Sequence, residues 1–276
     1  MYSLVRVGPY ICSEWENGGL PWWLLKKNIT TMRTSEERLE AKSCKYHQLQ
    51  ALLFKIAVKK WFSVLLPKIE PLLRQHGGPV LMVQVENEYG LYKACDREYT
   101  TWLRDLFLEY LGDEAVLYTT DPPSQVKCGA IPETLTTVDF GPTSERNINS
   151  SFEAQKKYFP DGHGPLVNSE FYPGWFVTWG QKAAKLPSPE EIVSSAKYMY
   201  GLGANINFYV IHGGTNFGFW NGAEPYAPCI TSYDFSAPIS EAGDVTPKYL
   251  AIRSWIKSIP DWKNKPLDIP ENNPYV

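Results

Sequence analysis

The sequence predicts an α/β fold in which short parallel strands alternate with helices. Six apolar runs have the length and composition of buried strands, and helical segments lie between most of them. Alternating elements of this kind need crossover connections, which build a parallel sheet. Near-continuous apolar runs also fit strands that are covered on both faces. The predicted strands are residues 4–11, 80–85, 115–120, 135–140, 165–169 and 206–211.

The helices are predicted from their own signals. Residues 97–111 place leucine, phenylalanine and tyrosine side chains on one face. Residues 188–191, Ser-Pro-Glu-Glu, form a capping box with a proline in the first turn, so a helix is expected to begin there. Residues 248–259 form a last amphipathic helix. Proline and asparagine recur from residue 260 onward, which predicts a tail or linker over 260–276.

Length and composition fit one large soluble domain. The chain has 276 residues, a formal net charge of −3 and 43% hydrophobic residues, and α/β barrels reach this length as a single unit. A near-neutral charge gives no field that would attract nucleic acid, so no nucleic-acid partner is expected. No apolar run approaches the ~20 residues of a membrane span. The first residues are typical of a strand and not of a signal peptide.

Polar residues of the types used in catalysis fall at or just after the predicted strand ends. A (β/α)8 barrel builds its active site there, and a doubly wound open sheet also binds ligands at the carboxyl ends of its strands, so both folds fit the pattern. The glycine-rich signatures of nucleotide binding are absent. These strand-end residues are Glu14, Glu16, Asn87, Glu88, Asp121, Asp139, Glu170 and Tyr209.

Three of these strand ends carry a glutamate beside an aromatic residue, in SEWENGG, QVENEYG and NSEFYPGW. A glycosidase needs two carboxyl groups across the scissile bond, one as acid and one as nucleophile or base. Lone glutamates at strand ends more often form solvated salt bridges, but three such motifs together favour a sugar site. Strand parity does not choose between Glu86 and Glu88, since residues two apart face one side. Position favours Glu88, which lies further beyond the strand and nearer the mouth, where a substrate can reach.

Four segments carry a resemblance to a known family: GPYICSEWENGGLPWWL, QVENEYG, VNSEFYPGW and FYVIHGGTNFGFWNGA. In this order they resemble glycoside hydrolase family 35, the β-galactosidases, over about residues 4–259. The resemblance implies a (β/α)8 TIM-type barrel, incomplete here because the first two strands are missing. It also implies a retaining exo-β-galactosidase that removes terminal non-reducing β-D-galactose from glycoconjugates by double displacement. No metal and no cofactor is implied.

The resemblance assigns roles to individual residues. Glu88 matches the acid/base and Glu170 the nucleophile, and retention of configuration requires a carboxyl separation of about 5–5.5 Å. Glu86 is left to structural support. Cys95 and Cys128 match a family disulfide, and Asn87 is expected to bind the sugar 2-hydroxyl. The implied galactose pocket contains Ser13, Glu14, Glu16, Asn87, Tyr172, Trp175, Tyr209 and Tyr233.

The family also sets expectations about substrates and location. Its members act on oligosaccharides, glycolipids and glycoproteins, and its animal members are lysosomal or secreted. Asn28 and Asn149 begin N-glycosylation sequons, which matter in the secretory pathway. The expected domains are a partial catalytic barrel over 1–259 and, at 260–276, a tail leading toward β-rich domains that this chain lacks.

Three features depart from the family pattern. The two leading strands are absent, residues 42–57 form an insertion of about one helix, and Phe235 replaces a tyrosine that touches galactose. Two open sheet edges are a liability for barrel closure. The alternative to an active enzyme is therefore a truncated, inactive form of one.

Overall fold

The computed structural model describes residues 2–27, 29, 31–34, 44–159, 162–181, 186–223, 227–260, 262–264 and 266–274, and for 44–50 the backbone alone. The chain divides into two compact units. Unit 1 comprises Met1–Ser13, Asn17–Thr137 and Gln155–Gly164, and unit 2 comprises Glu14–Glu16, Val138–Ala154 and Pro165–Val276. Each unit is described by itself.

All six predicted strands are present, and the hydrogen-bonded strand order is β1-β2-β3-β4-β5-β6. The pairs β1–β2, β2–β3, β4–β5 and β5–β6 are parallel. A doubly wound sheet reverses its strand order at a switch point, so this sequential order excludes that alternative. The arrangement is a parallel α/β fold consistent with part of a TIM-type barrel. The strands are β1 Ser3–Arg6, β2 Val80–Gln84, β3 Leu117–Asp121, β4 Leu135–Asp139, β5 Val167–Phe171 and β6 Asn205–Phe208.

Two strands, β1 and β6, are shorter than the sequence predicts by more than one residue. β1 ends at Arg6, and not at residue 11, because Gly8 adopts a left-handed backbone with φ 85° and the next residue, a proline, has no N–H for the ladder. β6 ends at Phe208 because the chain beyond it bonds to a loop. There the Ile239 N–H donates to the Ile211 carbonyl at 2.8 Å.

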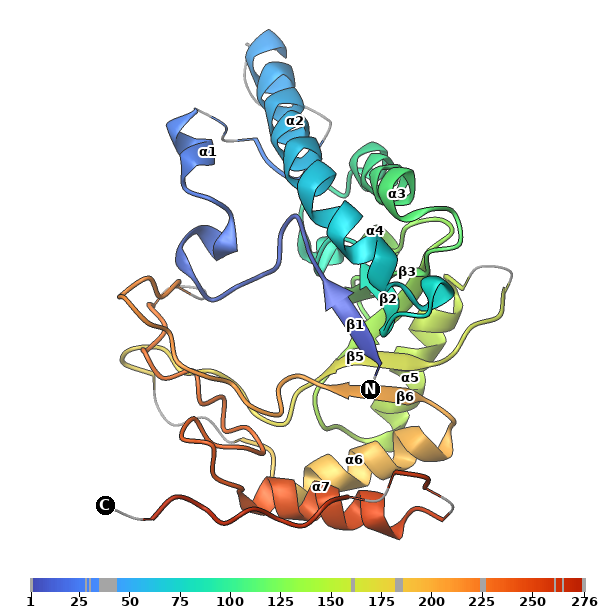
Figure 1. The fold of residues 1–276 in the computed structure, drawn as a ribbon, viewed down its shortest axis with the longest axis vertical. Coiled ribbons are helices and arrows are strands. Elements are labelled where there is room, and N and C mark those ends of the chain that lie inside the picture. The colour runs from blue at the N-terminus through green and yellow to red at the C-terminus, as the bar shows by residue number, and fades with distance from the viewer. Residues whose placement is uncertain are drawn as a thin grey trace. The chain divides into compact units, whose positions relative to one another are not determined.

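Unit 1 buries aromatic side chains between its two long helices, α2 (Cys44–Ile69) and α3 (Arg97–Leu111), which lie side by side in Figure 1. α3 has the predicted bounds. Asp96 caps it by accepting a hydrogen bond from the Tyr99 N–H at 3.0 Å. Phe62 and Phe107 meet edge to face across the helix pair at 4.9 Å. Unit 1 also contains the shorter α-helices α1 (Trp23–Lys26) and α4 (Val126–Gly129), and 3-10 helices at Glu70–Leu72, Arg74–His76 and Tyr89–Leu91.

The segment predicted to be an insertion, residues 42–57, forms part of α2 from Cys44 onward, and residues 42–43 lie outside the described residues. Phe54 in this segment is 1% exposed, and its ring centroid lies 6.3 Å from that of Tyr99 on α3. The segment therefore contributes to the core of unit 1. Its status as an insertion stays a prediction.

In unit 2, α6 (Pro189–Gly201) and α7 (Pro247–Ser258) lie side by side (Figure 1). α6 begins at the predicted capping box: the Glu191 N–H donates to Ser188 Oγ at 3.2 Å, and the Ser188 N–H donates to Glu191 Oε2 at 2.8 Å. α5 (Glu145–Lys156) runs from unit 2 into unit 1. None of the helices in the described part of the chain is long and apolar enough to cross a membrane.

The segment after residue 260 contains no helix or strand among its described residues, 262–264 and 266–274. It is nevertheless attached to unit 2. The Asn273 N–H donates to Asp244 Oδ1 at 2.6 Å, and the Val245 N–H donates to Asn272 Oδ1 at 2.9 Å. The end of the chain thus bonds to the loop before α7, and its predicted role as a tail or linker stays a prediction.

Candidate active site

The turn after β2 has a strained backbone that aims two neighbouring glutamates differently. Glu86 and Glu88 both adopt left-handed conformations, with φ of 61° and 42°. Non-glycine residues in this region are uncommon and concentrate at functional sites. The Glu86 N–H donates to the Gly8 carbonyl and the Glu88 N–H to the Thr120 carbonyl, each at 3.1 Å. The premise that both carboxylates face one side of a strand is therefore wrong, because β2 has already ended at Gln84.

Glu86 is a buried structural carboxylate. It is 1% exposed and forms a salt bridge with Arg33 at 2.9 Å between Oε2 and Nη2. The Tyr99 hydroxyl donates to Glu86 Oε1 at 2.7 Å, and the Asn87 N–H donates to Oε2 at 3.1 Å. The Arg33 guanidinium also lies over the Tyr10 ring, 4.0 Å from its centroid. With its oxygens held in this way, Glu86 is unsuited to reach a substrate.

Asn87 and Glu88 follow Glu86 in this turn and differ in exposure. Asn87 is 3% exposed, and its Oδ1 accepts hydrogen bonds from Arg6 and from Gln84 Nε2, the latter at 2.9 Å. Its Nδ2 then donates to Glu88 Oε2 at 3.3 Å. Of the three consecutive residues Glu86, Asn87 and Glu88, the last is the one whose side chain is partly exposed. Glu88 is thus the carboxylate of this turn that solvent and a substrate can reach.

Asp121, at the end of β3, is fully buried beneath the same turn. Its Oδ1 accepts a hydrogen bond from the Gly90 N–H at 2.6 Å, while Oδ2 has no partner among the described residues. A Cβ atom at Gly129 would lie 1.9 Å from Oδ2, so glycine is required there. Burial raises the pKa of Asp121 well above its usual range, although the Gly90 hydrogen bond acts in the opposite sense, and the nearby charge of Glu88 raises it further.

The disulfide Cys95–Cys128 joins the loop after this turn to α4, with its Cα atoms 5.2 Å apart. This is the pair that the resemblance implies. Ser13 is half-buried, and its N–H donates to the Gly18 carbonyl at 3.3 Å. Asn28 lies outside the described residues, so its sequon stays a prediction. Asn149 is exposed on α5, where its Nδ2 donates to the Tyr198 hydroxyl at 2.8 Å.

In unit 2, Glu170 is placed by β5 and held by its neighbours. It is 5% exposed, and its backbone N–H donates to Asn168 Oδ1 at 3.2 Å. The Tyr172 hydroxyl lies 3.0 Å from Glu170 Oε2 and 3.0 Å from Asp139 Oδ1. The Tyr172 hydroxyl therefore helps to orient the carboxylate predicted to be the nucleophile.

Most of the predicted pocket residues of unit 2 gather in one aromatic cluster. Glu14 Oε2 accepts a hydrogen bond from the Tyr233 hydroxyl at 2.7 Å, and burial, followed by the neighbouring Tyr209 and Glu14, raises the pKa of Tyr233. Phe235 contacts the rings of Trp175, Tyr209 and Tyr233 at centroid distances of 5.8, 5.9 and 5.6 Å. The Tyr172 ring in turn contacts those of Trp175 and Tyr209, so all five rings belong to one cluster.

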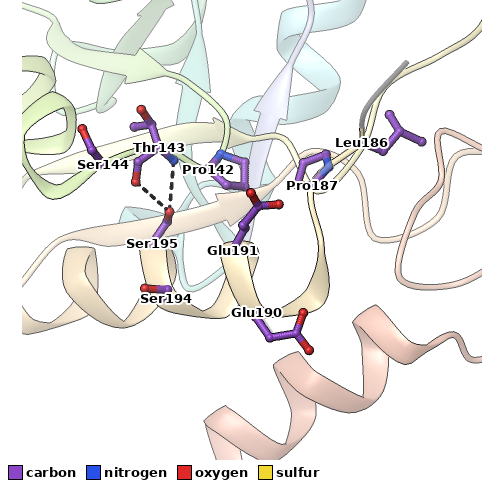
Figure 2. Close-up of a pocket in the computed structure, with 9 residues that line it drawn as sticks. All are labelled: Pro142, Thr143, Ser144, Leu186, Pro187, Glu190, Glu191, Ser194 and Ser195. Carbon is purple, nitrogen blue, oxygen red and sulfur yellow. Dashed lines mark hydrogen bonds between the residues drawn. The ribbon is translucent and has the colours of Figure 1, made fainter. Parts of the chain in front are cut away.

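Glu16 lies apart from that cluster's contacts. It is exposed, and its backbone N–H donates to the Trp220 carbonyl at 2.8 Å. A pocket of about 590 Å³ also lies elsewhere in unit 2 (Figure 2), lined by Pro142, Thr143, Ser144, Leu186, Pro187, Glu190, Glu191, Ser194 and Ser195. None of the predicted site residues lines it, and Glu191 there is engaged in the capping box of α6.

Sequence reasoning did not assign a role to Lys248, which joins two loops of the aromatic cluster. Its Nζ donates to the Pro173 carbonyl at 2.7 Å and to the Ser236 carbonyl at 2.8 Å. Burial lowers the pKa of Lys248. A cation in the first turn of a helix interacts unfavourably with the helix dipole. The position of Lys248 in the first turn of a predicted helix was therefore the feature of the sequence that indicated a role outside the helix.

Comparison with known proteins identifies the family. The sequence profile of glycosyl hydrolases family 35 matches residues 1–259. The chain belongs to this family. It is 47% identical over 270 residues to a mouse β-galactosidase-1-like protein, covering 97% of this chain and 39% of that protein. It is 49% identical over 257 residues to human β-galactosidase, covering 92% of this chain and 35% of that protein. The chain thus spans little more than a third of the length of these family 35 relatives.

The fold is shared more widely than the family. A crystal structure of a GH2 β-galacturonidase from Eisenbergiella tayi, bound to galacturonate, matches with a TM-score of 0.50 at 12% identity. The match covers 78% of this chain and 38% of that one. At this identity the likeness concerns the fold alone. In this family 35 chain, the predicted carboxylates fall into two groups, Glu88 with Asn87 in unit 1, and Glu170 with Glu14 and the aromatic cluster in unit 2.

Proposed function

We propose that this chain carries the catalytic machinery of a retaining exo-β-galactosidase, which removes terminal non-reducing β-D-galactose by double displacement. The observation that carries the proposal is the contrast among the glutamates. Glu88 is partly exposed beside Asn87. Glu170, in β5, is within hydrogen-bond distance of the Tyr172 hydroxyl. Glu86 is instead engaged by Arg33 and Tyr99. Two carboxyl groups in different surroundings are what acid and nucleophile roles require.

In the first step a Glu170 oxygen forms a bond to the anomeric carbon as the bond to the leaving oxygen breaks, and Glu88 transfers its proton to that oxygen. In the second step a water oxygen bonds to the anomeric carbon while the ester bond to Glu170 breaks. Glu88, now a carboxylate, takes the proton of this water. Galactose is released with its configuration retained, and both glutamates return to their starting states.

The remaining residues bind and orient the sugar. Asn87 would hydrogen-bond the 2-hydroxyl, an interaction that strengthens in the transition state. Ser13, Glu14 and Glu16 would line the galactose pocket, with Tyr209 and Tyr233 contributing hydroxyl groups. The aromatic faces suit the apolar face of a sugar ring, and the Tyr233–Glu14 hydrogen bond supports this role by fixing a polar group among them.

The substrates of the proposed enzyme are β-galactosides of oligosaccharides, glycolipids or glycoproteins, in a lysosomal or secreted setting that the family resemblance implies. A disulfide within unit 1 supports an oxidising compartment, since structural disulfides are rare in the cytosol. N-glycosylation at Asn149 fits its exposed position. The domain limits of 1–259 and 260–276 belong to the same proposal.

Hydrolysis of a chromogenic β-galactoside at acid pH by this chain, beside its Glu170→Gln variant, tests the proposal. Turnover by the unmodified chain that disappears in the variant is expected, because a carboxamide cannot form the glycosyl ester. A folded chain without turnover would refute activity for this form. It would favour the alternative, an inactive part of a β-galactosidase, which the coverage of about a third of each relative makes the second candidate.

A further inference from the structure

A second buried carboxylate lies beside Glu170. The pairing of β4 with β5 places Asp139 opposite Glu170, and the two residues are 3% and 5% exposed. Two adjacent carboxylates withdrawn from water repel each other unless hydrogen bonds are directed at them. The Tyr172 hydroxyl is directed at both, at 3.0 Å from an oxygen of each.

The Tyr172 hydroxyl lies within hydrogen-bond distance of two carboxylate acceptors. A phenol carries one hydrogen, so Tyr172 cannot give a full hydrogen bond to both carboxylates at once. Its ring is fixed by edge-to-face contacts with Trp175 and Tyr209, at centroid distances of 5.2 and 6.2 Å. Because the ring cannot swing away, the hydroxyl hydrogen is left to turn between Asp139 and Glu170.

We propose that Asp139 and Tyr172 are positioning residues for Glu170. During each catalytic cycle the Tyr172 hydroxyl switches its hydrogen bond from Glu170 to Asp139 and back. The inference rests on the proposed function, in which Glu170 is the nucleophile. No bond to hydrogen breaks in this exchange. The hydroxyl rotates, and the acceptor of its hydrogen bond changes.

The exchange follows from the charge of Glu170. Before the attack Glu170 is an anion, and Asp139 draws part of the hydrogen bond away, which leaves the attacking oxygen more nucleophilic. In the galactosyl ester Glu170 carries no charge and is a weaker acceptor, so the hydroxyl turns to the Asp139 anion. As water breaks the ester, charge returns to Glu170, and the hydroxyl stabilises the departing carboxylate.

The two residues therefore assist opposite steps, and that distinguishes positioning from a merely structural role. Asp139→Asn removes the competing anion, so the hydroxyl binds Glu170 throughout and attack slows. Tyr172→Phe removes the hydroxyl, so the departing carboxylate loses its hydrogen bond and ester breakdown slows. A general loosening of the site would slow both steps together in both variants.

The experiment measures each step separately with 2-deoxy-2-fluoro-β-galactosyl fluoride. In labelling, a Glu170 oxygen bonds to the anomeric carbon as the carbon–fluorine bond breaks and fluoride leaves. In reactivation, a water oxygen bonds to that carbon, the ester breaks, and Glu88 takes the proton. Intact-protein mass spectrometry at saturating reagent follows both rates, and peptide mapping locates the label.

We expect Asp139→Asn to slow labelling about tenfold with reactivation nearly unchanged, and Tyr172→Phe to slow reactivation about tenfold with labelling unchanged or faster. Tyr198→Phe is the matched control, because it removes a phenol hydroxyl from α6 in the same unit, and both its rates should equal those of the unmodified chain. Both test substitutions nearly preserve shape. If circular dichroism shows that one variant is unfolded, the rates of the other decide.

Equal slowing of the two steps, or rates unchanged in both variants, would overturn the inference while the proposed function stood. An unmodified chain that takes no label at Glu170 would refute the proposed function, and the inference would fall with it. The two failures are thus distinguishable from the same data.

Discussion

Glu86 and Glu88 lie two residues apart in one turn, and exchanging each for glutamine should have opposite consequences. Glu86→Gln removes the charge that pairs with Arg33 at 2.9 Å, although its oxygen can still accept the hydrogen bond from Tyr99. Glu88→Gln alters a partly exposed side chain, whose contact with Asn87 Nδ2 an amide oxygen can keep. We expect the first change to reduce stability and the second to reduce catalysis.

The structure gives the size of the first effect. Arg33 is 8% exposed and Glu86 is 1% exposed, so the variant leaves a guanidinium without its counter-charge inside the protein. Removing one partner of a buried ion pair costs about 3–5 kcal/mol in the free energy of unfolding. A domain has roughly 5–15 kcal/mol in total. Glu88→Gln should change the same quantity by less than about 0.5 kcal/mol, as most exposed substitutions do.

Urea unfolding followed by circular dichroism measures this difference directly. The control is the double variant Arg33→Met with Glu86→Gln. Replacing both charges of a buried pair is often nearly neutral, so it should recover most of the lost stability. The galactosidase assay supplies the second readout, in which Glu88→Gln should lose turnover of substrates with poor leaving groups. Labelling by a galactosyl fluoride should persist, because fluoride leaves without an acid.

Two results would refute this reasoning. If Glu86→Gln were as stable as the unmodified chain, the ion pair with Arg33 would not hold the turn. If Glu88→Gln lost as much stability as Glu86→Gln, the distinction between a structural and an accessible glutamate would be wrong, and the proposed acid/base role would lose its structural support.

Three further predictions concern the surroundings of the two glutamates. Burial raises the pKa of Asp121, so its contribution to stability is complete below the ordinary carboxyl pKa of about 4 and is lost as the pH rises through the raised value. Urea unfolding midpoints measured upward from about pH 4 should therefore fall less steeply with pH in Asp121→Asn than in the unmodified chain. An equally steep fall in the variant would contradict this. Lys248→Met removes the hydrogen bonds to the Pro173 and Ser236 carbonyls and should lower the free energy of unfolding by about 1.5–3 kcal/mol, whereas Lys257→Met near the other end of α7 should be neutral. Reduction of the Cys95–Cys128 disulfide, which spans 33 residues, should cost about 3–4 kcal/mol, and a thermal midpoint that dithiothreitol leaves unchanged would show that the link is dispensable.

The strands were predictable from the sequence because each lies in a short apolar run, and the fold buries most residues of the central strands. β3 to β5 lie almost wholly inside, and a buried strand shows its position through composition alone. The capping box of α6 and the bounds of α3 were equally local signals. The N-terminal half of α2 was harder to interpret. Its packing in the core depends on the contact between Phe54 and Tyr99, which lies 45 positions further along the chain.

Sequence reasoning named a set of candidate site residues but not the contacts among them. The parity rule failed at Glu86 and Glu88 because it assumes a strand, and the left-handed backbone there has no signature in the sequence. The engagement of Tyr172 by Asp139 and Glu170 depends on the register of β4 against β5. Register between distant strands follows from packing of the whole sheet, which residue types alone do not specify.

The ion pair between Arg33 and Glu86 also has a consequence for the order of folding. The two residues are 53 positions apart, and α2 forms within the intervening segment. A guanidinium sheds its water at high free-energy cost unless an anion is already in place, so collapse around Arg33 has to wait for Glu86 to arrive. The turn that bears Glu88 and the distant segment that bears Arg33 should therefore become ordered in the same kinetic event. An intermediate with this turn formed and Arg33 still in water should not accumulate.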